Sequence, residues 1–444
     1  MPTPSRPARI TAAAVTAAAC LGASALPAAA TPSDDAVISR GVTIPTFYSP
    51  PSALPQANGA LVRTEPLPLA LSLPGVDGPL PGTATRLMYK STDSNGLPVA
   101  VTGAYIEPSA AWEGAGARPL VAVAPGTMGQ GDQCAASLGL ENPLRFNGQT
   151  ISVGYEDLAV YRLLAKGIAV VVTDYAGLGA TDRLHTYVNR VDEAHAVLDA
   201  VRAARSVSGA SITSASRVAL FGYSQGGGAT AAAAELQATY APDVTLAGTY
   251  SGAPPANLTE VTQAIDGSDL AGALGWSVNG FLQTDPSLKP IADAHLNAAG
   301  RAALGDLSTM CVGDALFAYN SARSTAWTTD GRSISDVIAS EPALRAFLAE
   351  QRIGTLRPSG PVRLATGTSD NLVPHAQARQ LAVDWCRKGA DVTYKPVILP
   401  DLGRSLINHF TPLLTDQGEA ISWLTDRLNG EPATSNCATL PLRP

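Results

Sequence analysis

The amino-acid sequence predicts an α/β fold: a mostly parallel central sheet flanked by helices, with a helical cap inserted between late strands. Three observations carry this prediction: recurring apolar runs, a glycine-flanked serine, and one long stretch without such runs. The runs are almost wholly apolar and are separated by helical patterns, which indicates strands buried on both faces and therefore mostly parallel. They cover residues 97–106, 120–124, 168–175, 218–221, 246–251, 362–366 and 392–399.

The first thirty residues are typical of an export signal. Arg6 and Arg9 form a basic start, residues 10–26 are small and apolar, and Ala28-Ala29-Ala30 resembles a cleavage site. We therefore expect cleavage after Ala30 and a secreted, extracellular protein. A membrane anchor is disfavoured because the run is mostly alanine, contains Pro27 and lacks a basic stop-transfer flank. Lipidation at Cys20 is an alternative, although Ala17 stands where a larger aliphatic residue is expected.

Composition excludes some functions and leaves others open. The chain has 30 Lys and Arg against 37 Asp and Glu, and two of those arginines lie in the signal, so the mature net charge is about −9. Basic residues do not cluster, so no nucleic-acid partner is expected. We also expect no stable membrane insertion, and the oligomeric state stays open. With 45% hydrophobic and 15% charged residues, the chain can bury a large core.

The predicted core is divided in two along the chain. Its first part covers residues 31–257, of which 31–60 are rich in Pro, Ser and Ala and are expected as an extended surface arm without a compact element. Residues 189–205 show helical spacing behind a polar cap, as a crossover helix does. The second part covers residues 351–444, with helices expected at 376–386 and 418–428.

Between the two parts, the strand pattern stops at Pro255 and resumes at Pro361. Helical patterns broken by Gly, Pro and Asp fill the interval, at residues 258–264, 270–282, 287–303, 310–318 and 334–351. Several helices in succession without a strand favour a separate cap or lid at 258–350 over ordinary crossover helices. Such a cap would lie over the carboxyl edge of the sheet.

The glycine-flanked serine is Ser224, in Gly222-Tyr223-Ser224-Gln225-Gly226. It follows the apolar run 218–221 and precedes an alanine-rich helical run. Strand, sharp turn and helix are the context of a nucleophile elbow, in which small neighbours let the two backbones cross closely. Ser224 is therefore the predicted nucleophile, and it requires a base and an acid that orients the base.

His409 is the expected base. In hydrolases with such an elbow, the acid and the histidine follow the serine along the chain. His185 and His195 precede Ser224 and do not fit this order. His295 lies in the expected cap and reads as a solvated helix residue. His409 follows the last strand, where a loop would return the imidazole to the sheet edge; His375, at a helix start, is the rival.

Asp370 is the expected acid, because it lies in the loop after the run 362–366. It could instead be an Asx-turn residue, and Asp401 is the rival carboxylate. The oxyanion needs two donors. The backbone N–H of Gln225, next to the nucleophile, should supply one, and Thr127 in the loop after the run 120–124 should supply the other.

Four cysteines remain after the signal, Cys134, Cys311, Cys386 and Cys437, and they permit three pairings in an oxidising exterior. No spacing among them suggests a metal site. The sequence thus predicts no metal and no cofactor.

Several segments together resemble the secretory lipases of the α/β-hydrolase superfamily, of the yeast lipase A type with a large helical cap. They are Ala124-Pro125-Gly126-Thr127, Gly131-Asp132-Gln133-Cys134, Thr173-Asp174-Tyr175-Ala176-Gly177-Leu178-Gly179, the serine elbow with Gly227, Gly367-Thr368-Ser369-Asp370 and Asn408-His409. The resemblance covers nearly the whole mature chain. It implies an α/β-hydrolase fold, the triad Ser224, Asp370 and His409, and Thr127 with Gln225 as oxyanion donors.

The resemblance also implies the pairings Cys134 to Cys311 and Cys386 to Cys437. In the family the cap holds the acyl chain, so apolar cap residues are candidates to line an acyl tunnel, with cap core as the alternative: Leu270, Leu274, Trp276, Phe281 and Leu282. At the position of Thr127 some relatives carry an acidic residue, which leaves the part of its side chain open.

The expected function is a secreted serine lipase or carboxylesterase, similar to triacylglycerol lipases, that hydrolyses acylglycerols or other apolar esters through an acyl-enzyme on Ser224. A transient contact with a lipid interface fits such a substrate. An acyltransferase, a polyester hydrolase or a peptidase could use the same triad. A non-catalytic binding protein is the remaining alternative, because a fold does not dictate function.

Overall fold

The computed structural model describes residues 37–72, 81–442 and 444. The predicted signal, its cleavage after Ala30 and the alternative at Cys20 lie outside the described residues. Residues from Val37 onward form one unit. None of the helices within the described ranges is sufficiently long and apolar to span a bilayer.

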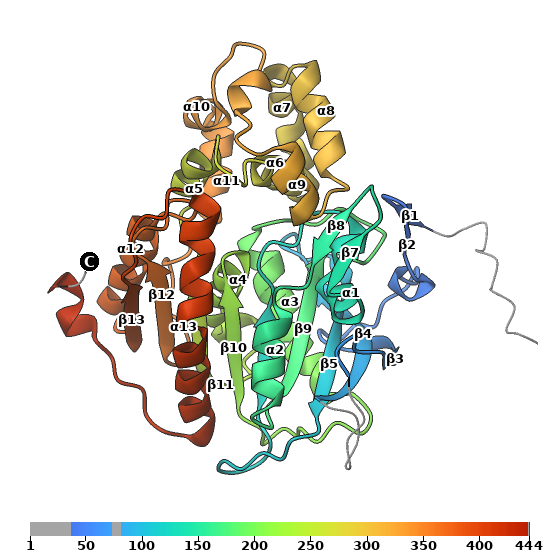
Figure 1. The fold of residues 1–444 in the computed structure, drawn as a ribbon, viewed down its shortest axis with the longest axis vertical. Helices are drawn as coiled ribbons and strands as arrows, with labels where there is room; N and C mark the ends of the chain where they lie inside the picture. Colours follow the sequence, from blue (N-terminus) through green and yellow to red (C-terminus); the bar gives the residue numbers. More distant parts are fainter. Residues whose placement is uncertain (1–36, 73–80, 443) are drawn as a thin grey trace, which may run out of the picture. The chain divides into compact units, whose positions relative to one another are not determined.

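A nine-stranded sheet forms the centre of this unit (Figure 1), in the order β13-β12-β11-β10-β6-β9-β5-β4-β3. The six strands from β13 to β9 pair in parallel, and β5, β4 and β3 continue the sheet in antiparallel pairs. The predicted mostly parallel sheet is therefore confirmed. The strands are β3 (Leu61–Leu67), β4 (Gly82–Thr92), β5 (Pro98–Pro108), β6 (Leu120–Ala124), β9 (Ala169–Ala176), β10 (Val218–Tyr223), β11 (Leu246–Gly252), β12 (Val362–Gly367) and β13 (Val392–Val397).

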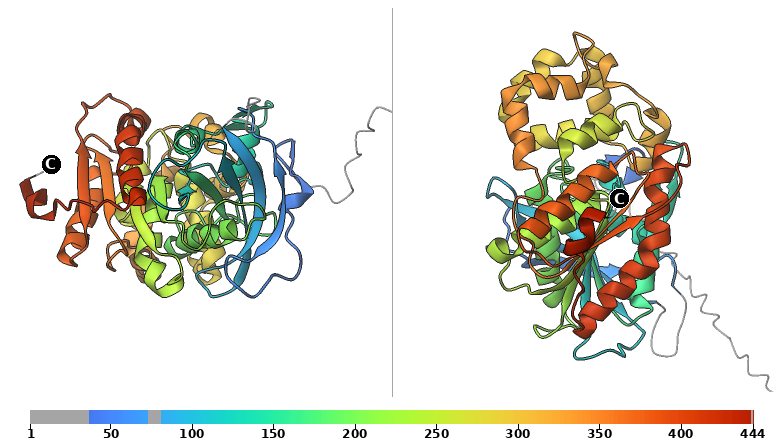
Figure 2. Two further views of the ribbon diagram at one scale, coloured as in Figure 1. Left: turned by 90° about the horizontal axis from the view of Figure 1, so that it is seen from below. Right: turned by 90° about the vertical axis from the view of Figure 1, so that its left-hand side faces the viewer.

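Helices cover both faces of the sheet (Figure 2). Successive strand residues point to opposite faces. On β9, Val171 packs into the core beneath α3, α4 and α12, whereas Val170 and Val172 pack into the core beneath α2 and α13. The apolar strand runs follow from this burial on both sides. The core helices are α1 (Ala136–Glu141), α2 (Asp157–Leu164), α3 (Arg190–Arg205), α4 (Gln225–Tyr240), α12 (His375–Arg387) and α13 (Ser405–Asn429).

Seven α-helices lie between β11 and β12 and form most of a third apolar cluster, which Tyr187, Val188, Leu372 and Val373 join from outside. Figure 1 and the right view of Figure 2 place them beyond the carboxyl ends of the parallel strands. Two of the expected helical stretches are each divided: 287–303 at Leu296, and 334–351 at Glu341, where Pro342 starts a new helix. The helices are α5 (Leu258–Ile265), α6 (Ala273–Thr284), α7 (Lys289–His295), α8 (Ala298–Leu307), α9 (Val312–Ala318), α10 (Ile334–Ser340) and α11 (Pro342–Glu350).

The expectation of an arm without compact elements over 31–60 is wrong for its described part. Short strands β1 (Ile38–Ser39) and β2 (Val42–Thr43) pair, and a 3-10 helix spans Thr46–Tyr48. Tyr48 is fully buried, and its hydroxyl bonds to Ser137 Oγ (2.6 Å) and accepts from Arg86 Nη1 (2.7 Å). Proline-rich composition indicated an open segment, but its aromatic residues attach it to the core.

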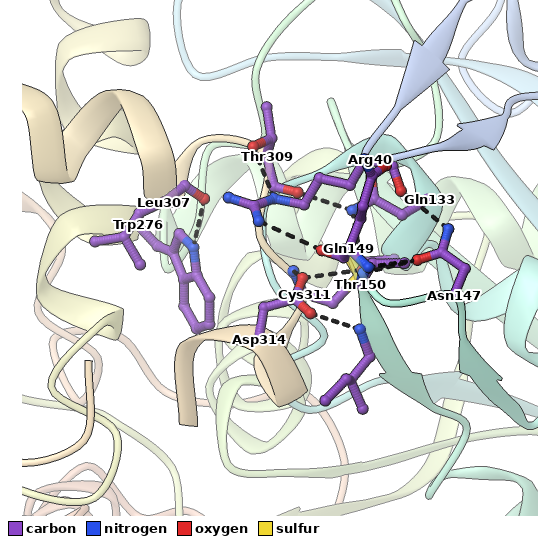
Figure 3. Close-up of a disulfide and its surroundings, with 12 residues drawn as sticks. Arg40, Gln133, Asn147, Gln149, Thr150, Trp276, Leu307, Thr309, Cys311 and Asp314 are labelled. Carbon is purple, nitrogen blue, oxygen red and sulfur yellow. Dashed lines mark hydrogen bonds between the residues drawn. A yellow bond between two sulfur atoms is a disulfide. The ribbon is translucent and has the colours of Figure 1, made fainter. Parts of the chain in front are cut away.

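Two disulfides join distant segments, Cys134 to Cys311 and Cys386 to Cys437. These are the pairings that the family resemblance implies. Figure 3 shows the first, which lies between the loop after β6 and the start of α9. Beside it, Asp314 accepts from Thr150 Oγ1 (2.9 Å) on the small hairpin formed by β7 (Leu144–Phe146) and β8 (Ile151–Val153). The Cys134–Cys311 disulfide therefore links the seven-helix group covalently to the loop that follows β6.

Candidate active site

Ser224 stands on the turn between β10 and α4. Its backbone has φ 59° and ψ −125°, a conformation that residues other than glycine rarely adopt. A Cβ at Gly222 would collide with the carbonyl of Gly226, and a Cβ at Gly226 with the carbonyl of Ala124. The glycines therefore allow the close crossing that raises Ser224 above the carboxyl edge of the sheet.

The structure brings Ser224, His409 and Asp370 together. His409 Nε2 lies 2.8 Å from Ser224 Oγ, and His409 Nδ1 lies 2.7 Å from Asp370 Oδ2. The other Asp370 oxygen accepts from the backbone N–H groups of Leu372 and Val373. A proton on Nδ1 facing the carboxylate leaves Nε2 free to accept the serine proton. His409 lies in the second turn of α13, not in a loop as expected, because α13 already begins at Ser405.

The rival residues are occupied elsewhere. His375 begins α12, and its Nε2 lies 3.2 Å from the hydroxyl of Tyr394. Asp401 accepts from Asn408 Nδ2 at 2.8 Å and from a backbone N–H two residues later. Asp401 therefore stabilises the loop before α13 through these hydrogen bonds, while Asp370 faces His409.

Two further histidines have structural partners. His195 bonds to the carbonyl of Thr92 (2.6 Å) and stacks on Tyr240. The expectation of a solvated His295 is wrong, because only 18% of its side chain is exposed and its Nε2 lies 2.9 Å from Glu341 Oε1.

Thr127 lies in the loop after β6, opposite the start of α4. The Tyr155 hydroxyl donates to the Thr127 carbonyl (3.0 Å), and the N–H of Gly126 donates to Glu156 Oε1 (2.7 Å). Burial raises the pKa of Glu156 to about 7. Within the described part of the chain, neither the N–H of Thr127 nor that of Gln225 donates to an acceptor, so both are free for an oxyanion.

Three buried side chains that sequence reasoning missed adjoin these donors. The Gln225 side-chain amide donates to His185 Nε2 (3.0 Å) and to Glu193 Oε1 (2.8 Å), and the Tyr187 hydroxyl lies 2.7 Å from Thr127 Oγ1. Burial raises the pKa of Glu193 to about 8 and lowers that of His185 to about 4. No motif marks these residues, since their contacts arise only when the segment after β9 meets α4.

One cavity lies at Ser224, and a second cavity lies next to it within the seven-helix group. The first, of about 30 Å³, is lined by Ser224, Thr127 and Gln225 together with residues of α5 and α6. The second, of about 70 Å³, lies among α6, α7, α10 and α11. The two cavities adjoin each other, because they share four lining residues: Thr262, Leu274, Ser277 and Phe281.

Four of the five candidates for an acyl tunnel line one or both cavities, and the fifth lines neither. Leu270 lines the first cavity, Leu282 the second, and Leu274 and Phe281 line both. Trp276 lines neither and is fully buried, with its indole N–H donating to the Leu307 carbonyl at 2.9 Å. The prediction for Trp276 is therefore wrong: on α6 this side chain points into the packing against α8.

Comparisons with known proteins agree with this architecture. A family model described as "Secretory lipase" matches residues 140–436. A "probable inactive lipase" of Mycobacterium tuberculosis is 28% identical over 398 residues, 88% of this chain and 83% of the relative. A "secreted triacylglycerol lipase" of Malassezia globosa is 28% identical over 245 residues, 54% of this chain and only 52% of the relative. The crystal structure of Candida antarctica lipase A in its closed state superposes with a TM-score of 0.72 at 20% identity, covering 88% of this chain and 87% of that one. This likeness shows the α/β-hydrolase fold.

Proposed function

Because this chain belongs to the secretory lipase family, we propose that it is a secreted serine hydrolase that cleaves apolar carboxylic esters, with Ser224 as the nucleophile. The single observation that carries the proposal is the continuous hydrogen-bonded chain from Ser224 Oγ through His409 to Asp370, on a strained turn at the carboxyl edge of the sheet. An acid, a base and a nucleophile in this order are what acyl transfer requires.

The reaction would proceed in two halves. Ser224 Oγ attacks the ester carbonyl carbon while His409 Nε2 takes the hydroxyl proton, and the carbonyl oxygen becomes an oxyanion that accepts from the N–H groups of Thr127 and Gln225. The intermediate collapses, and His409 returns the proton to the leaving alcohol. Water then attacks the acyl-enzyme with His409 as base, and the carboxylic acid leaves as Ser224 regains its proton.

The apolar cavities support an apolar acyl group. A chain bound at Ser224 would pass Leu274 and Phe281 to reach the second cavity, where 13 of the 17 lining residues are aliphatic or aromatic. The first cavity has room for about two water molecules, so entry of an ester would require its walls to move apart. An acylglycerol would fit this path, and a lipid interface would present one.

Secretion is proposed on the basic and apolar start of the chain and the two disulfides, which favour an oxidising compartment. The boundaries of the core at 31–257 and 351–444 and of the cap at 258–350 are likewise proposed. The apolar cluster formed mainly by α5 to α11 supports them.

Hydrolysis of p-nitrophenyl esters of increasing acyl length, by wild type and Ser224→Ala, tests the proposal. We expect hydrolysis of medium and long chains, and a loss of about 10⁵-fold or more in kcat for the variant. Equal rates for the two proteins would overturn the assignment and favour a non-catalytic member. Turnover of only the shortest ester would indicate an esterase, and product appearing as a new ester in the presence of an alcohol would indicate an acyltransferase.

A further inference from the structure

The segment 185–188 lies between β9 and α3 and contacts both proposed oxyanion donors. His185 bonds to the side chain of Gln225, and Tyr187 bonds to the side chain of Thr127. The two donors themselves lie on different elements, at the start of α4 and in the loop after β6. One short segment thus spans the distance between them, and we refer to residues 185–188 as the bridging segment.

The first contact has a defined polarity. His185 is fully buried, and its Nδ1 lies 2.9 Å from the carbonyl of Ala176, so the ring carries its proton on Nδ1. Nε2 is then an acceptor for the amide of Gln225. Tyr175 stacks on the imidazole with an interplanar angle of 16° and fixes its plane. The low pKa of His185 keeps the ring neutral, and therefore accepting, at neutral pH.

The second contact couples the Gln225 amide to the backbone of the bridging segment. Glu193 Oε1 accepts both from Gln225 Nε2 (2.8 Å) and from the N–H of Val188 (2.9 Å). Val188 has φ 56°, a left-handed conformation that is strained for a β-branched residue. Such strain persists only where the surroundings over-determine it, and it gathers at functional sites. A single buried carboxyl oxygen thus holds both partners.

The third contact reaches the opposite donor. The Tyr187 hydroxyl lies 2.7 Å from Thr127 Oγ1, and the Tyr187 ring meets the His185 ring edge-on at 6.0 Å. The seven-helix group contacts the Tyr187 ring as well: the ring of Trp276, on α6, packs edge-on against the Tyr187 ring with 5.9 Å between their centroids. Movement of Tyr187 would therefore displace Thr127 relative to Gln225.

We propose that the bridging segment, together with Glu193, is a positioning element that sets the separation of the two oxyanion donors. The inference rests on the proposed function, since it assigns a role in stabilising the oxyanion. Both donors must approach the oxyanion to hydrogen-bond distance, and a displacement of about 1 Å can cost about 100-fold in rate. His185 and Glu193 act through Gln225 and not on the reacting atoms, whereas Tyr187 acts through Thr127 and also lines the cavity beside Ser224.

Two substitutions with matched controls test this. Gln225→Met removes the amide, and Gln237→Met removes a buried amide elsewhere on α4, which donates to the Ala241 carbonyl. Tyr187→Phe removes the hydroxyl and keeps the ring, and Tyr240→Phe removes a hydroxyl bonded to Asp199 away from the site. Hydrolysis of p-nitrophenyl butyrate and the rate of Ser224 phosphonylation by a p-nitrophenyl phosphonate would be measured, with the folded fraction from thermal denaturation.

For both site variants we expect kcat and the phosphonylation rate to fall about 10- to 100-fold with KM within about threefold, and both controls within about twofold of wild type. Glu193→Gln, which keeps the accepting oxygen, should retain kcat, whereas Glu193→Leu should lose it. The proposal is overturned if Tyr187→Phe and Gln225→Met keep kcat within about twofold, or if the loss merely follows the folded fraction. If Gln225→Met fails to fold, Tyr187→Phe decides. If wild type hydrolyses the ester no faster than Ser224→Ala, the proposed function itself is wrong. That outcome is visible without any of the positioning variants, so the two failures can be told apart.

Discussion

Removal of the Cys134–Cys311 disulfide by a double substitution to alanine should cost the protein a large part of its stability. The bond joins residues 177 apart, and loop-closure entropy for a loop of that length amounts to about 5 kcal/mol at 25 °C. The Cys386–Cys437 bond joins residues 51 apart, for which the same relation gives about 4 kcal/mol. The first double variant should therefore be less stable than the second by about 1 kcal/mol. Both sulfurs of the first bond are fully buried, so lost packing acts in the same direction.

Hydrolysis should respond differently from stability. Backbone pairing beside the bond does not depend on sulfur, because Val312 N–H donates to the Met128 carbonyl (2.8 Å) and Gln130 N–H to the Met310 carbonyl (2.9 Å). These bonds hold the loop after β6, which carries Thr127, against the start of α9. Per folded molecule at low temperature, the variant should hydrolyse p-nitrophenyl esters within about threefold of wild type.

Urea denaturation of wild type and the two double variants, followed by tryptophan fluorescence, measures the free energies of unfolding. Titration of Ser224 with a phosphonate gives the active fraction. A larger loss from the short-range bond than from the long-range bond would refute the reasoning. So would a loss of kcat of more than about tenfold in a folded Cys134→Ala/Cys311→Ala protein, because the loop would then depend on the disulfide itself.

Three further predictions concern the acid, a buried carboxyl and the acyl path. Asp370→Asn should lower kcat about 10⁴-fold in ester hydrolysis, while Asp401→Asn should stay within about twofold; comparable losses in the two would contradict the choice of acid. Burial raises the pKa of Glu193 to about 8, so the folded chain keeps a proton that the unfolded chain releases above about pH 4.5. The contribution of Glu193 to stability is therefore full in acid and is lost as pH rises towards about 8. The Tm of wild type minus that of Glu193→Gln should accordingly be larger at about pH 5 than at about pH 9. A difference in Tm that does not change with pH would contradict this prediction. Leu274→Trp should reduce the turnover of long-chain p-nitrophenyl esters relative to butyrate by about tenfold or more, whereas Trp276→Phe, outside both cavities, should keep the chain-length profile; an unchanged profile in the first variant would exclude this path.

The strands that the sequence predicted are those that packing makes recognisable. β6, β9 and β10 are buried on both faces, and their apolar runs end within two residues of the predicted limits. β3 and β4 were not predicted, because they lie at the antiparallel edge and carry polar residues that find specific partners. On β4, Arg86 pairs with Glu65 and Glu141, which no local pattern could indicate.

The candidate site likewise contains residues that could be predicted from the sequence and residues that could not. Ser224, Asp370 and His409 were predictable because acyl transfer requires those residue types, and the α/β-hydrolase fold supplies them in a given chain order. His185 and Glu193 were not, because a buried histidine and a buried glutamate carry no signature until the fold sets them against Gln225, 40 and 32 residues away. Trp276 was misassigned for a related reason. Apolar spacing identifies the buried faces of α6, but both a cavity wall and a packed core are apolar.

Conformational strain is concentrated where the proposed chemistry takes place. Of the described non-glycine residues with positive φ, four lie at the carboxyl edge of the sheet around the elbow: Tyr175, Val188, Ser224 and Ala253. Each such residue costs about 1–3 kcal/mol, and the buried carboxyls of Glu156 and Glu193 add the cost of holding a proton near neutral pH. Cys134 lies seven residues after Thr127, so the Cys134–Cys311 bond stabilises the fold close to the region that needs it. Long-range covalent and buried polar contacts thus stabilise the fold around these strained residues, and sequence similarity at 28% identity does not guarantee such contacts.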